Sequence, residues 1–260
     1  MLAKLLKYDF KSLSKTLLPI FGISFIIAII TRGITMLADK FSILSVPAGI
    51  FTFIFIIVLI AIPIVTFIFT ILKFYKNLVK DEGYLMHTLP VSKNALVLSK
   101  LISSCTYLIL SAIMIVLLVF VWGYGLLFDS KLLHMIWEVI RQSNIVFLIL
   151  LLLSIVISVI LNQVMIYASI ALGQKHNSKV AFSVIYGIVL YNVTQILTVV
   201  LLVPFMLLDS NYQQYIENSN VLDFGLVNGF LTYALVISVL FIIVYYFITV
   251  RTFHKKLNLD

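Results

Sequence analysis

The sequence predicts an all-α polytopic membrane protein with six transmembrane helices, and two observations lead to that class. Of the 260 residues, 63% are hydrophobic and 11% are charged, and the mean hydropathy is +1.18. Soluble domains carry roughly 45–50% apolar and about 25% charged residues. The apolar runs also exceed the ~20 residues that a helix needs to cross the hydrocarbon core. We therefore expect a single transmembrane domain over residues 1–260.

Six apolar runs are long enough to be spans, and polar loops separate them. They cover residues 17–37, 46–72, 96–126, 144–172, 180–208 and 229–250. Pro63 lies inside the second run, where its missing N–H and its ring should kink the helix or loosen one turn. We expect Pro63 to act as a hinge.

Residues 1–16 predict an amphipathic helix that lies in the membrane interface ahead of the first span. Apolar residues recur at helical spacing on one face, and polar residues lie opposite: Leu2, Leu5, Leu6, Phe10, Leu13 and Leu17 against Lys4, Lys7, Lys11, Ser14 and Lys15. Such a helix places its leucines at the acyl boundary and its lysines toward anionic lipid headgroups. A signal peptide is disfavoured, because a run of full span length follows without an A-x-A-like site.

The distribution of basic residues predicts the orientation of the chain. With six spans, both termini lie on one side, together with 14 of the 18 Lys and Arg residues. The other side holds the remaining four, which are Arg32, Lys40, Lys131 and Arg141. The positive-inside rule then places both termini in the cytoplasm of a plasma-membrane protein. The net charge of +8 is explained by these loops, so we expect no nucleic-acid partner.

The stretch Lys73–Lys100 is the only long polar interruption in the first half of the chain, and it predicts a cytosolic docking element. Acidic residues precede a short helix over 83–89, where they complement its dipole. Pro90 should end that helix, and Ser92 can cap a second helix that begins at Lys93. The short helix is too apolar for a bare loop, which favours a protein partner. The alternative is that it lies on the membrane or against the chain's own helices.

Missing motifs restrict the chemistry. The sequence has no G-x-x-x-x-G-K-[ST], no G-x-S-x-G and no H-E-x-x-H. The four histidines lie in separate loops or tails, so we expect no metal site. No charged residue lies near the middle of a span, although ion-coupled transporters usually bury such residues there. We expect no enzymatic activity in this chain, and any energy for uphill transport should come from outside it.

Two spans carry stripes of polar and small residues. One stripe holds Ser154, Ser158, Asn162 and Ser169, and the other holds Ser183, Gly187, Tyr191, Thr194, Gln195 and Thr198. Such residues usually serve helix–helix packing through hydrogen bonds and close approach. The functional alternative is a partly polar wall of a transport path. For that path the candidates are Asn162, Tyr191, Gln195 and Thr198.

Three features together resemble permeases of the ABC type-2 exporter class, especially small stand-alone permeases of Gram-positive bacteria. They are the N-terminal stretch LLKYDFKSLSKTLLP, the six spans, and the inner loop FYKNLVKDEGYLMHTLPVSKNALVLSKL. The resemblance covers essentially the whole chain, and D-E-G-Y-L-M-H-T-L-P-V-S is its most specific part.

The resemblance implies that two permeases pair, as a homodimer or a heterodimer, and bind two ATPase subunits that hold ATP and Mg. It implies that Asp81–Pro90 is the coupling helix and that the second and fifth spans line the dimer interface and the path. The ATPase-docking residues would be Asp81, Glu82, Tyr84, Leu85, Met86, His87 and Leu89. Members export peptides, toxins, antibiotics or lipids, some of them amphipathic peptides similar to phenol-soluble modulins.

Two other functions stay open at this point. One is an immunity or sensor protein that binds a peptide without transporting it, for which the acidic segment 209–223 is the candidate surface. The other is an intramembrane enzyme, which would need acidic, basic or metal-binding groups facing a cavity inside the spans.

Overall fold

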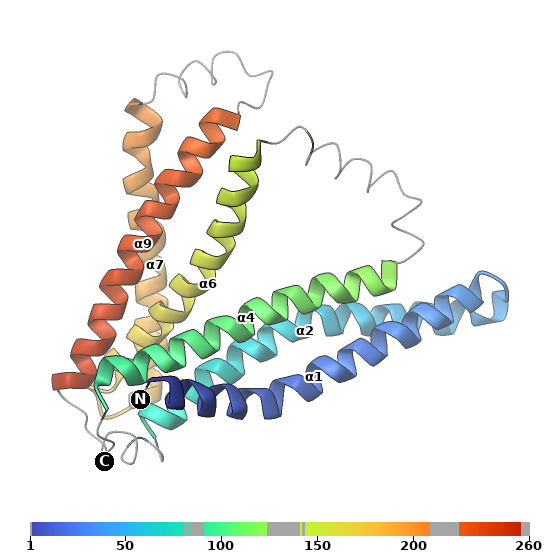
Figure 1. Cartoon of the computed structure of the whole chain (residues 1–260), viewed down its shortest axis with the longest axis horizontal. Helices are drawn as coiled ribbons and strands as arrows, with labels where there is room; N and C mark the ends of the chain where they lie inside the picture. Colours follow the sequence, from blue (N-terminus) through green and yellow to red (C-terminus); the bar gives the residue numbers. More distant parts are fainter. Residues whose placement is uncertain are drawn as a thin grey trace. The chain divides into compact units, whose positions relative to one another are not determined.

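A computed structural model describes residues 2–80, 83, 91–123, 141, 144–208 and 224–255, and the regular structure in these ranges is helical. The long helices are α1 (Leu2–Ala38), α2 (Ser45–Leu78), α4 (Lys93–Gly123), α6 (Ile145–Gly173), α7 (Lys179–Leu208) and α9 (Phe224–Lys255), with a short 3-10 helix, η1 (Ser42–Leu44), before α2 (Figure 1). All six long helices are long and apolar enough to cross a membrane. The prediction of an all-helical chain with six candidate spans is confirmed.

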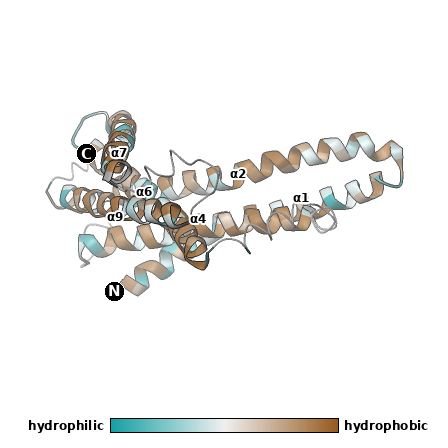
Figure 2. Cartoon of the chain, turned by 90° about the horizontal axis from the view of Figure 1, so that it is seen from above, coloured by the Kyte–Doolittle hydropathy of each residue, from teal (hydrophilic) through white to brown (hydrophobic). Residues whose placement is uncertain are grey.

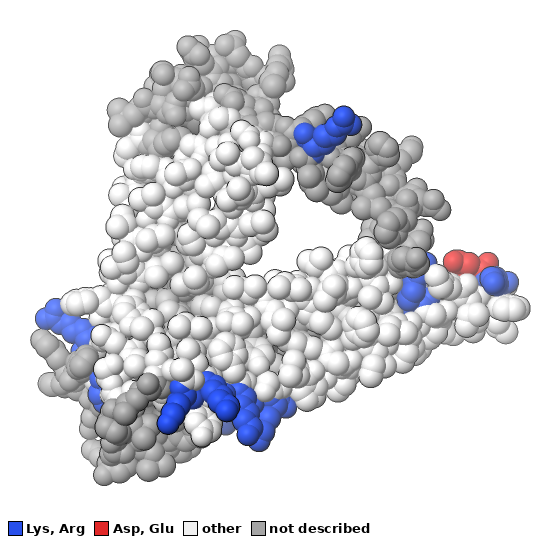
Figure 3. Space-filling model, in the orientation of Figure 1, with Lys and Arg blue, Asp and Glu red and all other residues white. Residues whose placement is uncertain are grey.

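The helices consist mainly of apolar residues along most of their length, as the hydropathy colouring in Figure 2 shows, and many of these side chains are exposed. In α2, Phe53, Ile57 and Ile60 have exposed fractions of 66%, 50% and 60%. On the face drawn in Figure 3, Lys and Arg gather toward the ends of the helices. The sequence of the six long helices places no Lys or Arg at their middles. Exposed large hydrophobic side chains in such numbers suit a lipid solvent and would cause aggregation in water.

The chain forms two compact units. One consists of Met1–Lys73 with Leu98–Trp137, and the other of Phe74–Val97 with Glu138–Asp260. Helices α2 and α4 both cross the boundary, so the C-terminal end of α2 and the N-terminal end of α4 belong to the second unit. Residues 74–97 of the predicted docking stretch therefore belong to the second unit, together with α6, α7 and α9.

The first unit has its core where α1, α2 and α4 meet. The buried cluster consists of Leu13, Leu17, Phe21 and Ala28 of α1, Phe55 and Ile62 of α2, and Tyr107 and Leu118 of α4. Phe55 also stacks on Trp122, with ring centroids 5.8 Å apart. In this cluster the buried stripe of α1 begins at Leu13, about one turn before the predicted first span.

The separate N-terminal interfacial helix is a point where the structure differs from the sequence-based prediction. Residues 2–38 form one continuous helix with Pro19 inside it. At 1.5 Å per residue this helix is about 55 Å long, which is well beyond the ~30 Å hydrocarbon core. Leu13 and Leu17 are buried against the protein instead of facing acyl chains. Contacts of Asp9 and Phe10 with α4, described below, accompany this packing.

Pro63 lies within an uninterrupted α2. The preceding residue, Ile62, is 2% exposed, and its carbonyl accepts a hydrogen bond from the Thr66 hydroxyl at 2.8 Å. The turn around the proline is thus packed and hydrogen-bonded, and the role of Pro63 as a hinge stays a prediction.

In the second unit, α6 packs against both α7 and α9 (Figure 1). The turn from α6 to α7 is tight, because Gly173 lies directly against the first turn of α7. A Cβ atom at Gly173 would be 2.7 Å from the Ser183 nitrogen and 2.8 Å from the Lys179 carbonyl oxygen. Both are backbone atoms, so neither can move aside without shifting the helix.

We predict that Gly173→Ala destabilises the second unit by about 1–3 kcal/mol, the range for overpacking a close contact. The measurement is the thermal unfolding midpoint of the detergent-solubilised chain. Gly187→Ala is the matched control, because a Cβ there would meet only the Ser169 side chain at an ordinary 3.6 Å. Equal midpoints for the two variants would contradict the close approach at Gly173.

Candidate functional site

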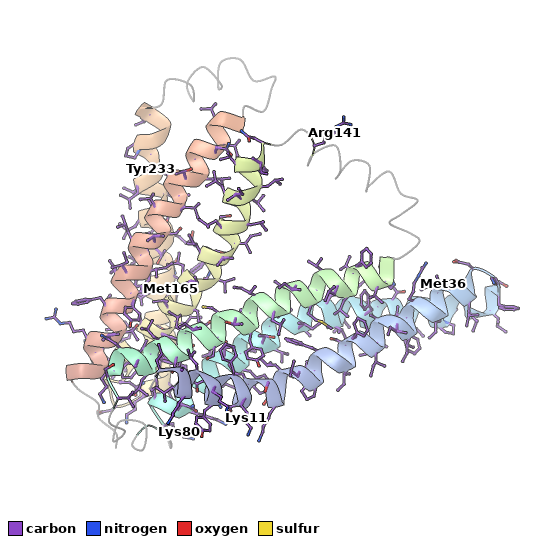
Figure 4. All side chains as sticks on the ribbon, in the orientation of Figure 1. Lys11, Met36, Lys80, Arg141, Met165 and Tyr233 are labelled. Atoms are coloured by element: carbon purple, nitrogen blue, oxygen red, sulfur yellow. The ribbon has the colours of Figure 1, made fainter. Side chains whose placement is uncertain are left out.

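The docking stretch begins at the end of α2, which aromatic packing holds in place. Phe74 is fully buried and stacks on Tyr167 of α6, with ring centroids 3.6 Å apart. Phe253 of α9 meets the Phe74 ring edge-on at 6.0 Å. Beyond the helix, the Lys80 N–H donates to the Tyr75 carbonyl at 3.1 Å and turns the chain (Lys80 is labelled in Figure 4). The entry to the stretch is thus anchored on two helices of the second unit.

The stretch ends at the start of α4, and the predicted cap is present there. The Ser92 hydroxyl accepts the Ala95 N–H at 3.3 Å, and α4 begins at Lys93. Leu96 and Val97 are each 2% exposed, so the first two turns are packed. Between these ends, the predicted docking residues (Asp81, Glu82, Tyr84, Leu85, Met86, His87 and Leu89) lie outside the described residues. Their role stays a prediction.

A polar pair behind the aromatic cluster was not found from the sequence. Gln163 of α6 is fully buried, and its amide nitrogen donates to the Tyr167 hydroxyl at 3.1 Å. The Gln163 side-chain oxygen is buried without a hydrogen-bond partner. The pair orients the Tyr167 ring on which Phe74 stacks. A glutamine four residues before a tyrosine is the only local signal, and it does not indicate a contact with α2.

The polar stripe of α7 divides into an inward and an outward part. Thr194 is 6% exposed, and its hydroxyl bonds to the Leu190 carbonyl and to the Tyr245 hydroxyl of α9. It also lies 4.0 Å from the sulfur of Met165 on α6 (labelled in Figure 4). For this residue, packing between helices is confirmed. Thr198, a path candidate, is partly buried and donates to the Thr194 carbonyl at 2.7 Å.

The other two path candidates on α7 face outward. Tyr191 is 50% exposed, and Gln195 is also exposed. Counted from the buried Ser183 at about 100° per residue, Thr194 is rotated by about 20°, whereas Tyr191 and Gln195 are rotated by about 80° and about 120°. The stripe that a four-residue spacing suggests therefore drifts around the helix and leaves the packed face.

The α6 stripe divides in the same way. Asn162 is exposed and donates its amide nitrogen to the Ser158 carbonyl of its own helix at 2.8 Å. Ser154 and Ser158 line a hollow of about 290 Å³ together with Ser238 and apolar residues of α9. Within the described part of the chain, no hydrogen bond joins Asn162 to the polar residues of α7. The path candidates are thus not assembled into one site in a single copy.

Metal-ligating side chains do not gather in the described residues, where no group of three or more His, Cys, Asp or Glu is found. His176, in the turn between α6 and α7, stacks on Phe182 with ring centroids 3.9 Å apart. Its ring nitrogen lies 3.1 Å from the Tyr186 hydroxyl. These contacts give His176 a packing role in the turn.

Comparisons with known proteins find no relative of this chain. No model of a protein family matches it, no curated protein matches it, and no solved structure is similar enough to match.

We predict that the outward polar face of α7 is reached by water in the membrane. In a Cys105→Ser background, Gln195→Cys should react with a membrane-impermeant cationic thiol reagent, because only a hydrated thiol ionises readily. The matched control is Val193→Cys, which is at similar depth, 41% exposed and on the other side of the helix. Equally slow labelling at both positions would show that lipid covers the polar face.

Proposed function

We propose that this chain is the transmembrane permease subunit of an ATP-driven exporter. Two copies would pair and use two separate ATPase subunits, which supply ATP, Mg and the hydrolysis step. The cargo would be an amphipathic peptide, toxin, antibiotic or lipid-like molecule that leaves the cell. The resemblance to ABC type-2 permeases supports this class through the inner-loop pattern D-E-G-Y-L-M-H-T-L-P-V-S.

The observation that carries the proposal is the exposed polar face in the middle of α7. Tyr191, Asn192 and Gln195 lie halfway along a helix of 30 residues, and all three are exposed. The Asn192 amide nitrogen donates to the Ile188 carbonyl of its own helix at 2.8 Å. For a polar group of this face that has no hydrogen bond, burial in an apolar environment costs roughly 2–7 kcal/mol. Contact of this face with lipid is therefore unfavourable. A second permease or a hydrated path beside it would lower this desolvation cost.

A path with this lining suits an amphipathic cargo. The polar side chains on α7 alternate with exposed apolar ones such as Ile188 and Ile196, at 59% and 63%. Such a wall offers hydrogen bonds and apolar contacts together, but no fixed charge that would select an ion. A molecule with one polar and one apolar face matches both parts of the wall.

The energy would enter at the docking stretch. Its two ends are packed within the second unit, at Phe74 of α2 and at Leu96 and Val97 of α4. A partner that moves residues 81–90 therefore acts on two helix ends that are already held against other helices. Because α2 and α4 continue into the first unit, the displacement has a covalent route into both units.

We predict that Leu85→Asp or Met86→Asp abolishes co-purification of an ATPase from native membranes while insertion of the chain persists. A buried unpaired carboxylate in an apolar contact costs several kcal/mol, which is enough to lose the complex. The matched control is Asn177→Asp, which places a carboxylate at an exposed position in the turn between α6 and α7. Unchanged co-purification of all three variants would refute docking at this helix.

A further inference from the structure

A buried ion pair joins the N-terminal arm of α1, residues 2–16, to the start of α4. The Lys100 ammonium donates to the Asp9 Oδ1 oxygen, although 91 positions separate the two residues in the sequence. Asp9 is 5% exposed and Lys100 is 3% exposed. Both belong to the first unit.

Other contacts nearby also hold the arm of α1 against α4. The Tyr107 hydroxyl of α4 donates to the Phe10 carbonyl at 3.1 Å, and the two rings lie 5.9 Å apart. Leu13, one turn after Asp9 on the same face, is buried in the core cluster. The arm would therefore stay on α4 through apolar packing even without charges.

The ion pair is hard to explain as a source of stability. Desolvating two charges costs about as much as their attraction returns, so replacing a buried pair by apolar residues is often neutral or stabilising. Here the second carboxylate oxygen, Asp9 Oδ2, is also buried and has no hydrogen-bond partner. A directional pair of this kind instead fixes the register between two helices, which a contact between apolar surfaces does not.

The position of the pair connects it with the docking stretch. Lys100 is the eighth residue of α4, about two turns from its first residue. The segment that precedes α4 is the stretch on which we propose that the ATPase acts. On α4, Lys100 is the third residue of the first unit counted from the docking stretch, so the pair lies where a displacement of α4 enters that unit.

We propose that Asp9 and Lys100 are positioning residues that form a latch, so that the arm of α1 and the start of α4 move as one body. The latch would also pass the displacement of residues 81–90 to α1, and this part of the proposal rests on the proposed exporter function. The latch itself is a property of the first unit and does not require an ATPase.

The first test measures the latch without nucleotide, in the full chain reconstituted in lipid nanodiscs. Spin labels replace Lys7 of α1 and Thr106 of α4, both exposed, in a Cys105→Ser background. We expect a narrow distance distribution in the parent and at least a twofold wider one in Asp9→Leu/Lys100→Met. The charge-swapped Asp9→Lys/Lys100→Asp should restore the narrow distribution, and Lys11→Met, an exposed lysine of the same arm, should not change it.

The thermal unfolding midpoint separates positioning from stability. The apolar double variant should keep the parent midpoint or exceed it while its distance distribution widens. A distribution as narrow as that of the parent would overturn the latch. A lower midpoint that accompanies the widening would show that the pair stabilises the fold instead of positioning the helices. That result would overturn the latch as well.

The second test adds the ATPase by using the complex purified from native membranes. Amide hydrogen exchange is compared with and without ATP and vanadate. In the parent, exchange should change at residues 81–90 and at residues 2–16, and in Asp9→Leu/Lys100→Met only the change at 81–90 should remain. A change at 2–16 that survives in the double variant would refute transmission through the latch. Unchanged hydrogen exchange at residues 81–90 in the parent would count against the proposed exporter function. The spin-label distances would still decide whether the latch exists.

Discussion

The bilayer offers almost nothing for a polar group to bind, and this constraint governs each part of the structure. Helices satisfy the backbone, and most hydroxyls in the described spans bond to a carbonyl of their own helix, as Thr66 and Ser158 do. Thr194, which packs inward, also finds a partner on a neighbouring helix, the Tyr245 hydroxyl. Tyr191 and Gln195 are exceptions, because they face outward at the middle of α7. Their position favours the proposal that something more polar than lipid lies beside this helix.

A second feature is the way in which the ends of helices are held. The aromatic cluster of Phe74, Tyr167 and Phe253 fixes the end of α2, and the Ser92 cap and buried Leu96 fix the start of α4. The ion pair of Asp9 and Lys100 adds α1 to this arrangement. The stretch between α2 and α4 is therefore set between supported ends. Such support is what a docking element needs if a partner is to move helices through it.

Much of the fold follows from the sequence because hydropathy and helix-capping signals are local. The six apolar runs, the start of α4 at Lys93 and its cap at Ser92 needed no knowledge of distant contacts. The pairing of Asp9 with Lys100 could not be predicted in this way, because 91 positions separate them. One signal was present, since Asp9 falls on the leucine face of the arm, where an acid needs a partner. Together with the apolar packing of Leu13 and the contact of Phe10 with Tyr107, this pairing joins residues 2–16 to α4.

The candidate path shows a different limit of sequence reasoning. A spacing of four residues places Ser183, Tyr191 and Gln195 on one apparent stripe, but each step of four turns the helix by about 40° past a full turn. Only the packed neighbours, here α6 and α9, decide where the stripe leaves the interior. The sequence could therefore indicate which residues are polar at mid-span, while their separation into Thr194 inside and Gln195 outside depends on tertiary packing.

The central claim is that this chain is one half of a paired permease driven by separate ATPases. The most direct measurement is native mass spectrometry of the chain extracted from its own membrane with bound lipid. The account predicts a complex of two copies of the chain, or one copy with a related permease, together with two ATP-hydrolysing subunits. A chain that appears alone under conditions that preserve other membrane complexes would contradict it.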